Sequence, residues 1–192
     1  MYHFIPLLIL TYLAGSVNFS ILLFRLLGKE DPRSQFSQNP GVVNVHRQTG
    51  PLWAAVILLL DLFRAAFIAY LALRYLPLVY LPWCALCLLI GNRYPIFHGF
   101  HGGKGVANFL GFTLFAAPWS AAMAAVVWTI IYGITRQPFL GSFGMILVLS
   151  AGLAWRCAYH PLAITAIFII CVFIVFAHRA NISRLLSAKK TP

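Results

Sequence analysis

The chain has 192 residues, of which 61% are hydrophobic and only 9% charged, and its mean hydropathy is +0.87. Soluble domains contain roughly 45–50% apolar and about 25% charged residues, so this composition excludes a soluble globular protein and predicts an integral membrane protein. The net charge of +11 does not indicate nucleic-acid binding, because an apolar chain confines its cations to short loops beside anionic lipid head groups. Membrane lipids are therefore the expected surroundings.

Polar and Pro/Gly-rich clusters divide the chain into apolar blocks that are candidate membrane spans. The blocks are residues 3–27, 51–73, 77–91, 105–117, 119–134, 143–155 and 161–177. A helix needs about 20 residues to cross a bilayer core of about 30 Å, so several blocks predict short or broken spans. The first block lacks the basic start of a secretory signal and is interpreted as a retained helix. The sequence thus predicts an all-α, polytopic membrane protein with a single domain over residues 1–192.

The number of spans depends on residues 105–134, which could form one long helix and give six spans. Pro118 and Trp119 favour a turn at the membrane surface, and hence seven. With seven spans, one side of the membrane receives Arg25, Lys29, Arg33, Arg47, Arg93, Lys104, Arg136, Arg179, Arg184, Lys189 and Lys190. The opposite side receives only Arg74 and Arg156. Because Lys and Arg favour the cytoplasm, we expect the N-terminus outside and the C-terminus in the cytoplasm.

The first polar cluster, residues 31–50, follows the first apolar block. Arg47 can bind an oxyanion with two parallel hydrogen bonds, and Ser37, Asn39 and Asn44 are neutral donors for the same kind of ligand. The alternative is a solvated loop that turns at Asn39-Pro40-Gly41.

Two charged residues lie inside the second block, at Asp61 and Arg64. Charges inside a membrane are costly, and a spacing of three along a helix lets these two pair with each other. We interpret them as a structural pair that could also support a nearby site.

Cysteines do not indicate a redox or metal site. Cys84 and Cys87 form a C-x-x-C inside an apolar run, where thiols are unreactive, and Cys157 and Cys171 stand alone. No second pair completes a zinc site, so no metal and no cofactor are expected.

The second polar cluster ends in Gly102-Gly103-Lys104-Gly105, immediately before an apolar block. Glycines allow successive backbone N–H groups to turn toward one point, the following helix offers the positive end of its dipole, and Lys104 adds a full charge. This combination favours a phosphate cradle, and the alternative is a flexible turn with a snorkelling lysine. The segment is not a Walker A loop, because no Ser or Thr follows the lysine. His98 and His101 lack the carboxylate or thiolate that would indicate a metal site.

The third cluster surrounds His178 and Asn181, which share a face if the last helix continues through them. Histidine can exchange a proton near pH 7, although the two side chains could instead cap the helix end at the interface. Neither a Ser–His–Asp set nor paired carboxylates accompany these clusters. Phosphate-binding residues without a catalytic triad suit a reaction whose substrates bring their own reactivity.

Five segments together resemble, in order and spacing, one family of bacterial membrane enzymes. They are Gly15-Ser16-Val17-Asn18-Phe19-Ser20; Asp31-x-Arg33; Ser37-x-Asn39-x-Gly41-x-x-Asn44-x-x-Arg47-x-x-Gly50; Pro95-x-Phe97-x-Gly99-Phe100-x-Gly102-Gly103-Lys104-Gly105-Val106-Ala107; and His178-Arg179-x-Asn181-Ile182-x-Arg184-Leu185-Leu186. Over nearly its whole length the chain is similar to the acyl-phosphate:glycerol-3-phosphate acyltransferases of the PlsY type.

The resemblance implies a seven-helix enzyme of the bacterial inner membrane with its site at the cytoplasmic face. It implies acyl transfer from acyl phosphate to the 1-hydroxyl of glycerol 3-phosphate, giving lysophosphatidic acid and phosphate, without CoA or acyl carrier protein. Four residues would be catalytic: Lys104, His178, Arg47 and Ser37. The substrate- and phosphate-binding residues would be Asn39, Gly41, Asn44, Gly102, Gly103, Gly105, Ser142 and Asn181. The family is thought to need no protein base, because a substrate phosphate assists deprotonation of the hydroxyl.

The chain departs from the family pattern at several neutral positions. Gln38 replaces a glycine, Val43 a hydroxyl residue, Asn92 a histidine, Phe139 a serine and Ala180 an acidic residue. The charged phosphate-binding set is intact, which favours a divergent but active member. Two other functions stay open: a transporter for an organic phosphate, and a non-catalytic paralogue that keeps only the fold.

Overall fold

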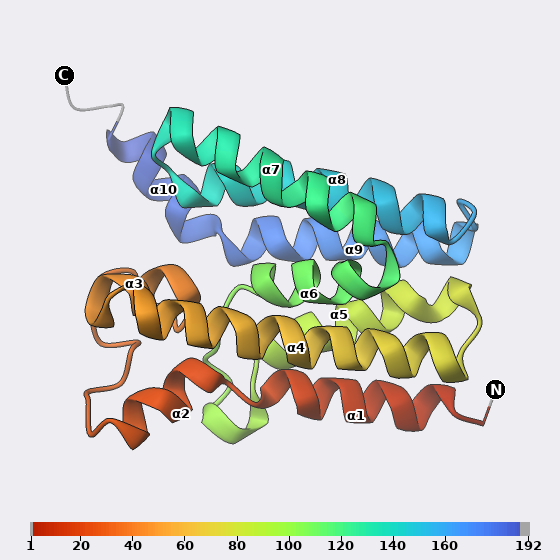
Figure 1. Ribbon diagram of the computed structural model, residues 1–192, viewed down its shortest axis with the longest axis horizontal. Helices are drawn as coiled ribbons and strands as arrows, with labels where there is room; N and C mark the ends of the chain where they lie inside the picture. Colours follow the sequence, from red (N-terminus) through yellow and green to blue (C-terminus); the bar gives the residue numbers. More distant parts are fainter. Residues whose placement is uncertain (1, 189–192) are drawn as a thin grey trace.

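The protein is a bundle of helices that run along one common axis (Figure 1). The computed structural model describes residues 2–188, and within that range the regular structure is entirely helical. The α-helices are α1 (Phe4–Ser16), α2 (Phe19–Leu26), α3 (Val42–Thr49), α4 (Pro51–Tyr75), α5 (Leu81–Arg93), α6 (Val106–Ala116), α7 (Pro118–Thr135), α8 (Pro138–Arg156), α9 (Pro161–Ala177) and α10 (Arg179–Ala188), with short 3-10 helices at Leu78–Tyr80 and Ile96–His98. Lys189 and Lys190, two of the cations assigned to the cytoplasmic side, lie outside the described residues.

Several of these helices are long and apolar enough to cross a membrane. They are Phe4–Leu26, which combines α1 and α2, then α4, α7 and α8, while α9 and α10 form a pair bent by 49° that qualifies as a fifth. The α5 and α6 helices have only 13 and 11 residues. At 1.5 Å per residue the shorter covers roughly 16 Å, about half of a bilayer core. The all-α membrane architecture is thus confirmed, and the count of seven spans stays a prediction.

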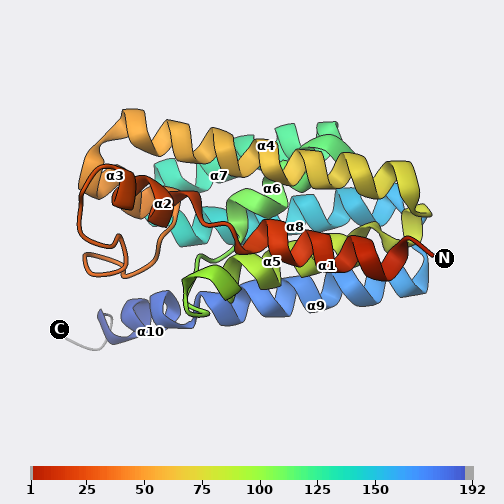
Figure 2. The same cartoon turned by 90° about the horizontal axis from the view of Figure 1, so that it is seen from below.

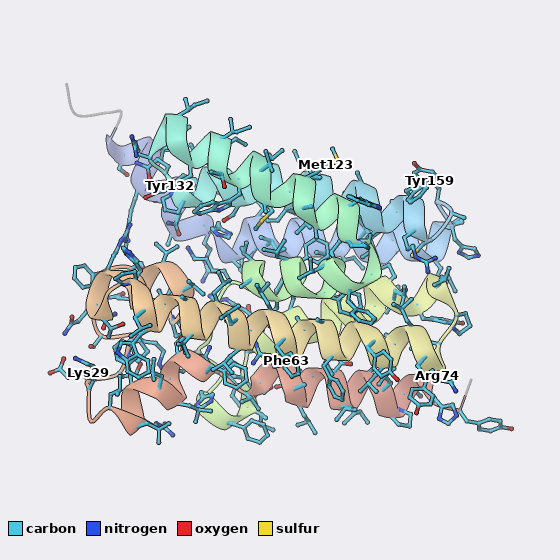
Figure 3. The ribbon with its side chains drawn as sticks, in the orientation of Figure 1. Lys29, Phe63, Arg74, Met123, Tyr132 and Tyr159 are labelled. Carbon is cyan, nitrogen blue, oxygen red and sulfur yellow. The ribbon has the colours of Figure 1, made fainter. Side chains whose placement is uncertain are left out.

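The surface of the bundle fits a bilayer. Figure 3 shows Lys29 and Arg74 at opposite ends of the long axis, with Phe63 and Met123 on the flanks. Phe63 is 75% exposed and Met123 62% exposed, and further large apolar side chains such as Leu147 are also exposed on the helices. An apolar surface this extensive would be unstable in water and is the surface that lipid chains cover.

The predicted continuous helix over residues 3–27 is wrong, because the chain breaks after Ser16. Asn18 has an extended backbone, and its side-chain oxygen accepts a hydrogen bond of 3.1 Å from the N–H of Ile21, which starts α2. Two loop boundaries also differ from the prediction. Residues 42–49 form α3 instead of loop, and α8 begins at Pro138 rather than near residue 143. The predicted turn between residues 105–117 and 119–134 is confirmed, since α6 ends at Ala116 and α7 begins at Pro118.

The α1 and α5 helices approach each other closely through two facing glycines. A Cβ atom on Gly91 would overlap the backbone oxygen of Tyr12, and one on Gly15 would overlap the backbone oxygen of Leu88. This close contact fixes the position of α5, whose C-terminal end leads into the glycine-rich segment before α6. The glycines are therefore packing residues in helices, where they would otherwise be unfavourable.

We expect Gly91→Ala to lower the free energy of unfolding by about 1–3 kcal/mol, because the backbone it meets cannot move aside without separating the helices. Gly133→Ala is the matched control, since Gly133 also lies within a helix, α7, and nothing lies within 4 Å of its added Cβ. That control should be neutral or stabilising by up to about 1 kcal/mol. Thermal unfolding in detergent compares the two, and equal melting temperatures would contradict the packing role.

Candidate active site

A cavity of about 420 Å³ lies where α3, α4, α6, α7, α8 and the start of α10 meet. Of the twelve predicted site residues, eleven line it: Ser37, Asn39, Gly41, Asn44, Arg47, Gly103, Lys104, Gly105, Ser142, His178 and Asn181. These residues are far apart in the sequence, from Ser37 to Asn181, and the fold brings them together. Gly102 is the predicted site residue that does not line the cavity.

The glycine-rich segment binds to the end of α5 before it enters α6. The N–H of Gly102 donates to the backbone oxygen of Arg93 at 3.0 Å, and that of Gly103 donates to the backbone oxygen of Asn92 at 2.9 Å. These two N–H groups are therefore not free to bind an anion. Gly102 is needed for packing instead, because a Cβ there would overlap Asn92 and Pro95.

The N–H groups available to an anion lie slightly further along the chain. Gly105 has a φ of +83°, a left-handed conformation that glycine adopts without strain, and it precedes the first residue of α6. Within the described residues, the N–H groups of Gly105, Val106 and Ala107 have no hydrogen-bond partner. All three residues line the cavity, so the free N–H groups and the positive end of α6 face the same space as Lys104.

Lys104 links the start of α6 to α10. Its ammonium group donates a hydrogen bond to the side-chain oxygen of Asn181, and the side chain is only partly exposed. Burial, together with repulsion from Arg93, Arg184 and Arg47, lowers the pKa of Lys104 to about 8. No carboxylate lies against it among the described residues, so its charge is available to an anionic ligand.

His178 occupies the bend between α9 and α10, so the last helix does not continue unbroken through His178 and Asn181. Its Nδ1–H donates to the backbone oxygen of Ile174 at 2.9 Å, and the edge of the ring meets Phe143 with centroids 5.3 Å apart. Burial and the charge of Lys104 lower the pKa of His178 to about 4. The ring is therefore neutral at pH 7, and Nε2 can only accept a hydrogen bond. The predicted catalytic role of His178 stays a prediction, and in this state the ring cannot donate a proton from Nε2.

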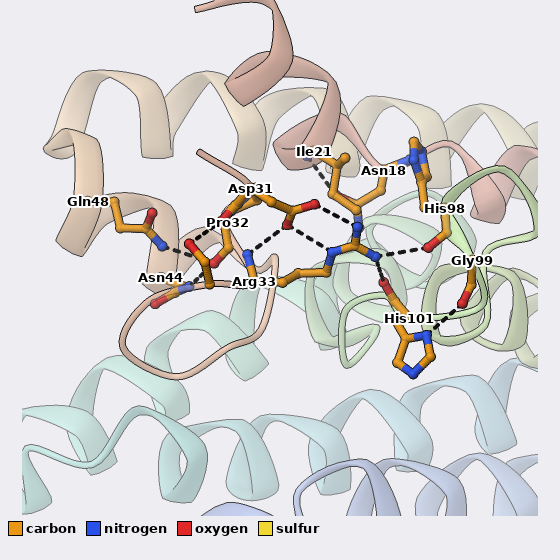
Figure 4. Close-up of polar contacts among 11 residues, drawn as sticks. Asn18, Ile21, Asp31, Pro32, Arg33, Asn44, Gln48, His98, Gly99 and His101 are labelled. Carbon is orange, nitrogen blue, oxygen red and sulfur yellow. Dashed lines mark hydrogen bonds and ion pairs between the residues drawn. The ribbon is translucent and has the colours of Figure 1, made fainter. Parts of the chain in front are cut away.

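The loop before α3 is held in shape by side chains that were predicted to contact substrate. The amide of Asn44 donates to the backbone oxygen of Pro32 at 2.8 Å (Figure 4). Its oxygen accepts from the N–H of Ser37 at 3.4 Å. The Asn44 side chain lines the cavity but is occupied by these bonds. It therefore positions Ser37 rather than offering free donors to a phosphate.

Arg33 ties this loop to the segment before α6, a contact that sequence reasoning missed. Its guanidinium pairs with Asp31 at 2.6 Å and donates to the backbone oxygens of His98 and His101 at 2.9 and 2.8 Å (Figure 4). His98 in turn accepts a hydrogen bond of 3.3 Å from the N–H of Asn18 through Nε2. Asp31-x-Arg33 stood out in the sequence only as part of the family pattern, and nothing in its spacing indicated the distant carbonyls.

Most of the departures from the family pattern cluster around the cavity. Gln38 has a φ of +54°, which explains why a glycine suits this position, and Val43 presents an apolar side chain where a hydroxyl is usual. Phe139 packs against Phe143, the residue that supports His178, with centroids 5.8 Å apart. Asn92 lines the cavity and Ala180 is exposed on α10.

Arg64 joins three elements beneath the cavity. It pairs with Asp61 at 2.7 Å as predicted, donates to the side-chain oxygen of Asn108 at 2.6 Å, and hydrogen-bonds the backbone oxygen of Val17 at the break between α1 and α2. Asp61 and Asn108 both line the cavity, and neither was among the predicted site residues. The polar Asn108 within an apolar block was the available signal.

The fold and this cavity define a class of protein: a helical membrane protein that gathers cations, free N–H groups and a neutral histidine at one end of its bundle. The family model described as glycerol-3-phosphate acyltransferase matches residues 5–188. The glycerol-3-phosphate acyltransferase of Bordetella petrii is 38% identical over 196 residues, covering 96% of this chain and 91% of that protein. That of Methylobacillus flagellatus is 35% identical over 183 residues, covering 95% and 93%. The chain belongs to the glycerol-3-phosphate acyltransferase family.

Solved structures agree with this family. The crystal structure of PlsY (YgiH), an integral membrane glycerol 3-phosphate acyltransferase, in its glycerol 3-phosphate form superimposes with a TM-score of 0.88 at 30% identity, covering 96% of this chain and 92% of that one. Its lysophosphatidic acid form gives a TM-score of 0.85 at 29% identity with the same coverage. The predicted membership of the PlsY family is thereby confirmed.

If Asp61 and Arg64 are a structural pair, Asp61→Asn should lower the free energy of unfolding by about 3–5 kcal/mol, because it leaves a buried cation without its counter-charge. The double change Asp61→Asn with Arg64→Gln should recover part of this loss. Thermal unfolding of the three proteins in detergent measures the coupling. Unchanged stability of Asp61→Asn together with lost activity would instead assign the pair to the reaction.

Proposed function

We propose that this protein transfers an acyl chain from an acyl phosphate to the 1-hydroxyl of glycerol 3-phosphate, releasing lysophosphatidic acid and inorganic phosphate. The observation that carries the proposal is that one cavity combines the cations Arg47 and Lys104, the neutral His178 and an apolar wall. Two substrates that each carry a phosphate require cations, and the acyl chain requires apolar surroundings. The family and the glycerol 3-phosphate form of the solved relative support the acceptor.

The residues of the cavity divide by chemistry into two regions. Arg47, Lys104 and the free N–H groups at the start of α6 hold phosphate oxygens, as charge-assisted bonds do in other phosphate sites. Ser37, Asn39, Ser142 and Asn181 add neutral hydrogen-bonding groups around them. The acyl chain lies along the apolar residues Leu58, Leu110, Trp128, Phe139 and Met145.

The reaction needs no protein base in this proposal. The 1-hydroxyl oxygen forms a bond to the acyl carbon, the bond from that carbon to the phosphate oxygen breaks, and the hydroxyl proton leaves on the departing phosphate. His178 is neutral, and its Nε2 accepts a hydrogen bond from a glycerol hydroxyl and so orients it. Lys104 and Arg47 stabilise the negative charge that develops on the leaving phosphate.

We extend the proposal to the acyl donor and to the location of the protein. The proposed acyl transfer involves no metal or other cofactor, and neither CoA nor acyl carrier protein delivers the acyl group. We further propose a single domain over residues 1–192 with seven spans in the bacterial inner membrane and the cavity at the cytoplasmic face. The eleven-to-two distribution of cations supports this orientation, as do the start of α1 and the end of α10, which lie at opposite ends of the bundle (Figure 1).

Purified protein with a long-chain acyl phosphate and glycerol 3-phosphate tests the function directly. Phosphate and lysophosphatidic acid should appear in equal amounts, and acyl-CoA should not replace the acyl phosphate. Glycerol 3-phosphate uptake into proteoliposomes without product formation would favour an organic-phosphate transporter. Neither activity in a folded protein would favour a non-catalytic paralogue.

Removal of either cavity cation should reduce kcat/KM by roughly tenfold to a hundredfold. This loss corresponds to one charge-assisted hydrogen bond of about 1.5–3 kcal/mol. The variants are Lys104→Ala and Arg47→Ala, with Lys29→Ala as the control, because Lys29 is an exposed loop cation that does not line the cavity. Lys104→Arg should recover little, since Gly103 and Gly105 bring backbone and substrate too close for a planar guanidinium. Near-normal kcat/KM in Lys104→Ala would contradict the proposed mechanism.

The lowered pKa of Lys104 predicts how activity changes with pH. Only the protonated lysine attracts phosphate, so kcat/KM should fall about tenfold between pH 7 and pH 9, with a midpoint near 8. The second ionisation of a phosphate ester, near pH 6, is nearly complete throughout this range. Bound phosphate favours the charged lysine, so kcat should begin to decline at a higher pH than kcat/KM does. A midpoint near 6.5 would instead indicate a titrating histidine and contradict the neutral state of His178.

The proposed orientation is tested by cysteine labelling in a cysteine-free variant. A cysteine replacing Gln35, in the exposed loop before α3, should resist an impermeant thiol reagent in intact cells. A cysteine replacing Tyr2, which is 96% exposed at the other end, should react. Disrupted cells serve as the control for reactivity at both positions. External labelling at position 35 would overturn the orientation.

A further inference from the structure

A second hollow lies outside the catalytic cavity, between α9 and α10. It is a groove of about 620 Å³, and its residues are entirely different from those of the cavity. The 49° bend at His178 creates it by folding α10 back from the line of α9. In the view of Figure 2 both helices follow the lower edge of the bundle, at its periphery.

One wall of the groove is apolar and belongs to a candidate membrane helix. Val172, Val175 and Phe176 of α9 are about half exposed, at 53%, 49% and 52%. Ile182 and Leu186 of α10 continue the apolar surface beyond the bend. Side chains of this kind on the outside of a membrane bundle contact the hydrocarbon chains of lipids.

The other wall of the groove is cationic and polar. The guanidinium of Arg179 lies over the ring of Phe176, 4.4 Å from its centroid, and Nη1 donates to the backbone oxygen of Phe176 at 3.4 Å. Ser183, one helical turn further along, adds a hydroxyl group to the same wall. The guanidinium therefore lies within the groove, between the apolar side chains of α9 and those of α10.

Among the described residues, no acidic side chain pairs with this cation. The chain has only three Asp and Glu residues, Glu30, Asp31 and Asp61. The two aspartates pair with Arg33 and Arg64, and none of the three lines the groove. A groove that combines apolar side chains with a guanidinium lacking an acidic partner and a hydroxyl group complements a molecule with hydrocarbon chains and an anionic head.

We propose that the groove binds one bilayer phospholipid with an anionic head group, its chains along α9 and its phosphate on Arg179 and Ser183. The lipid would hold α10 against the bundle. The opposite side of α10 carries Asn181, which accepts the hydrogen bond of Lys104. Lipid binding is therefore coupled to the position of the cavity lysine. The lipid site itself does not rest on the proposed acyl transfer, whereas its effect on catalysis does.

Native mass spectrometry of the full-length protein in detergent tests the binding. With equal amounts of added phosphatidylglycerol and phosphatidylcholine, we expect the wild type to retain phosphatidylglycerol with about fivefold preference, which corresponds to about 1 kcal/mol for one cation. Arg179→Gln should lose this preference, and Ser183→Glu, which places a negative charge in the groove, should lose it as well. Equal retention of the two lipids by the wild type would overturn the proposal without reference to any variant.

Arg74→Gln is the matched control. Arg74 is also an exposed arginine beside an aromatic ring, 5.9 Å from the centroid of Tyr75, but it lies at the other end of the bundle. The Arg74→Gln variant should keep the preference for phosphatidylglycerol. Loss of the preference in this variant would assign the lipid selectivity to general surface charge. In proteoliposomes, phosphatidylglycerol should lower the KM for glycerol 3-phosphate in the wild type relative to Arg179→Gln. A lipid preference without acyl transfer would retain the groove and reject the proposed function.

Discussion

Arg64 is the polar contact on which the arrangement of the cavity depends. In the apolar interior of a membrane protein, a backbone carbonyl released by a helix break must find a donor within the protein. Arg64 bonds the carbonyl of Val17 at the break between α1 and α2, and it also bonds Asn108 in the first turn of α6. The Asp61 carboxylate compensates its charge. One side chain therefore connects the break, α4 and α6, the helix that begins after Lys104 and Gly105.

A shortage of acidic residues gives the cavity its electrostatic character. Asp31 and Asp61 are used within the fold by Arg33 and Arg64, and Glu30 accepts a hydrogen bond from Gln35. Among the described residues, no carboxylate is left to neutralise Lys104 or Arg47. Burial, together with repulsion from Arg93, Arg184 and Arg47, lowers the pKa of Lys104, and the charge of Lys104 helps to keep His178 neutral. A phosphate would relieve this repulsion, which explains how a cavity with few strong hydrogen bonds of its own can favour a doubly charged ligand.

Interruptions of the helices supply the remaining functional groups. The end of α5 and the beginning of α6 lie inside the bundle, so α6 presents its free N–H groups to the cavity. The bend at His178 turns α10 so that Asn181 meets Lys104 on one side while Arg179 faces outward on the other. Uninterrupted spans would have satisfied all of their backbone groups internally and would offer no such donors.

The sequence by itself determined the membrane class, because an apolar chain with 9% charged residues cannot cover a water-exposed surface. It also identified eleven of the residues that line the cavity, since charged and glycine-rich clusters stand out in an apolar chain and their spacing matched a known family. Tertiary structure alone decided which polar groups remain free. The N–H groups of Gly102 and Gly103 and the amide of Asn44 bind backbone carbonyls, and His178 is neutral because of burial and a neighbouring lysine. These outcomes depend on contacts between segments far apart in the chain, which residue types and spacing do not specify.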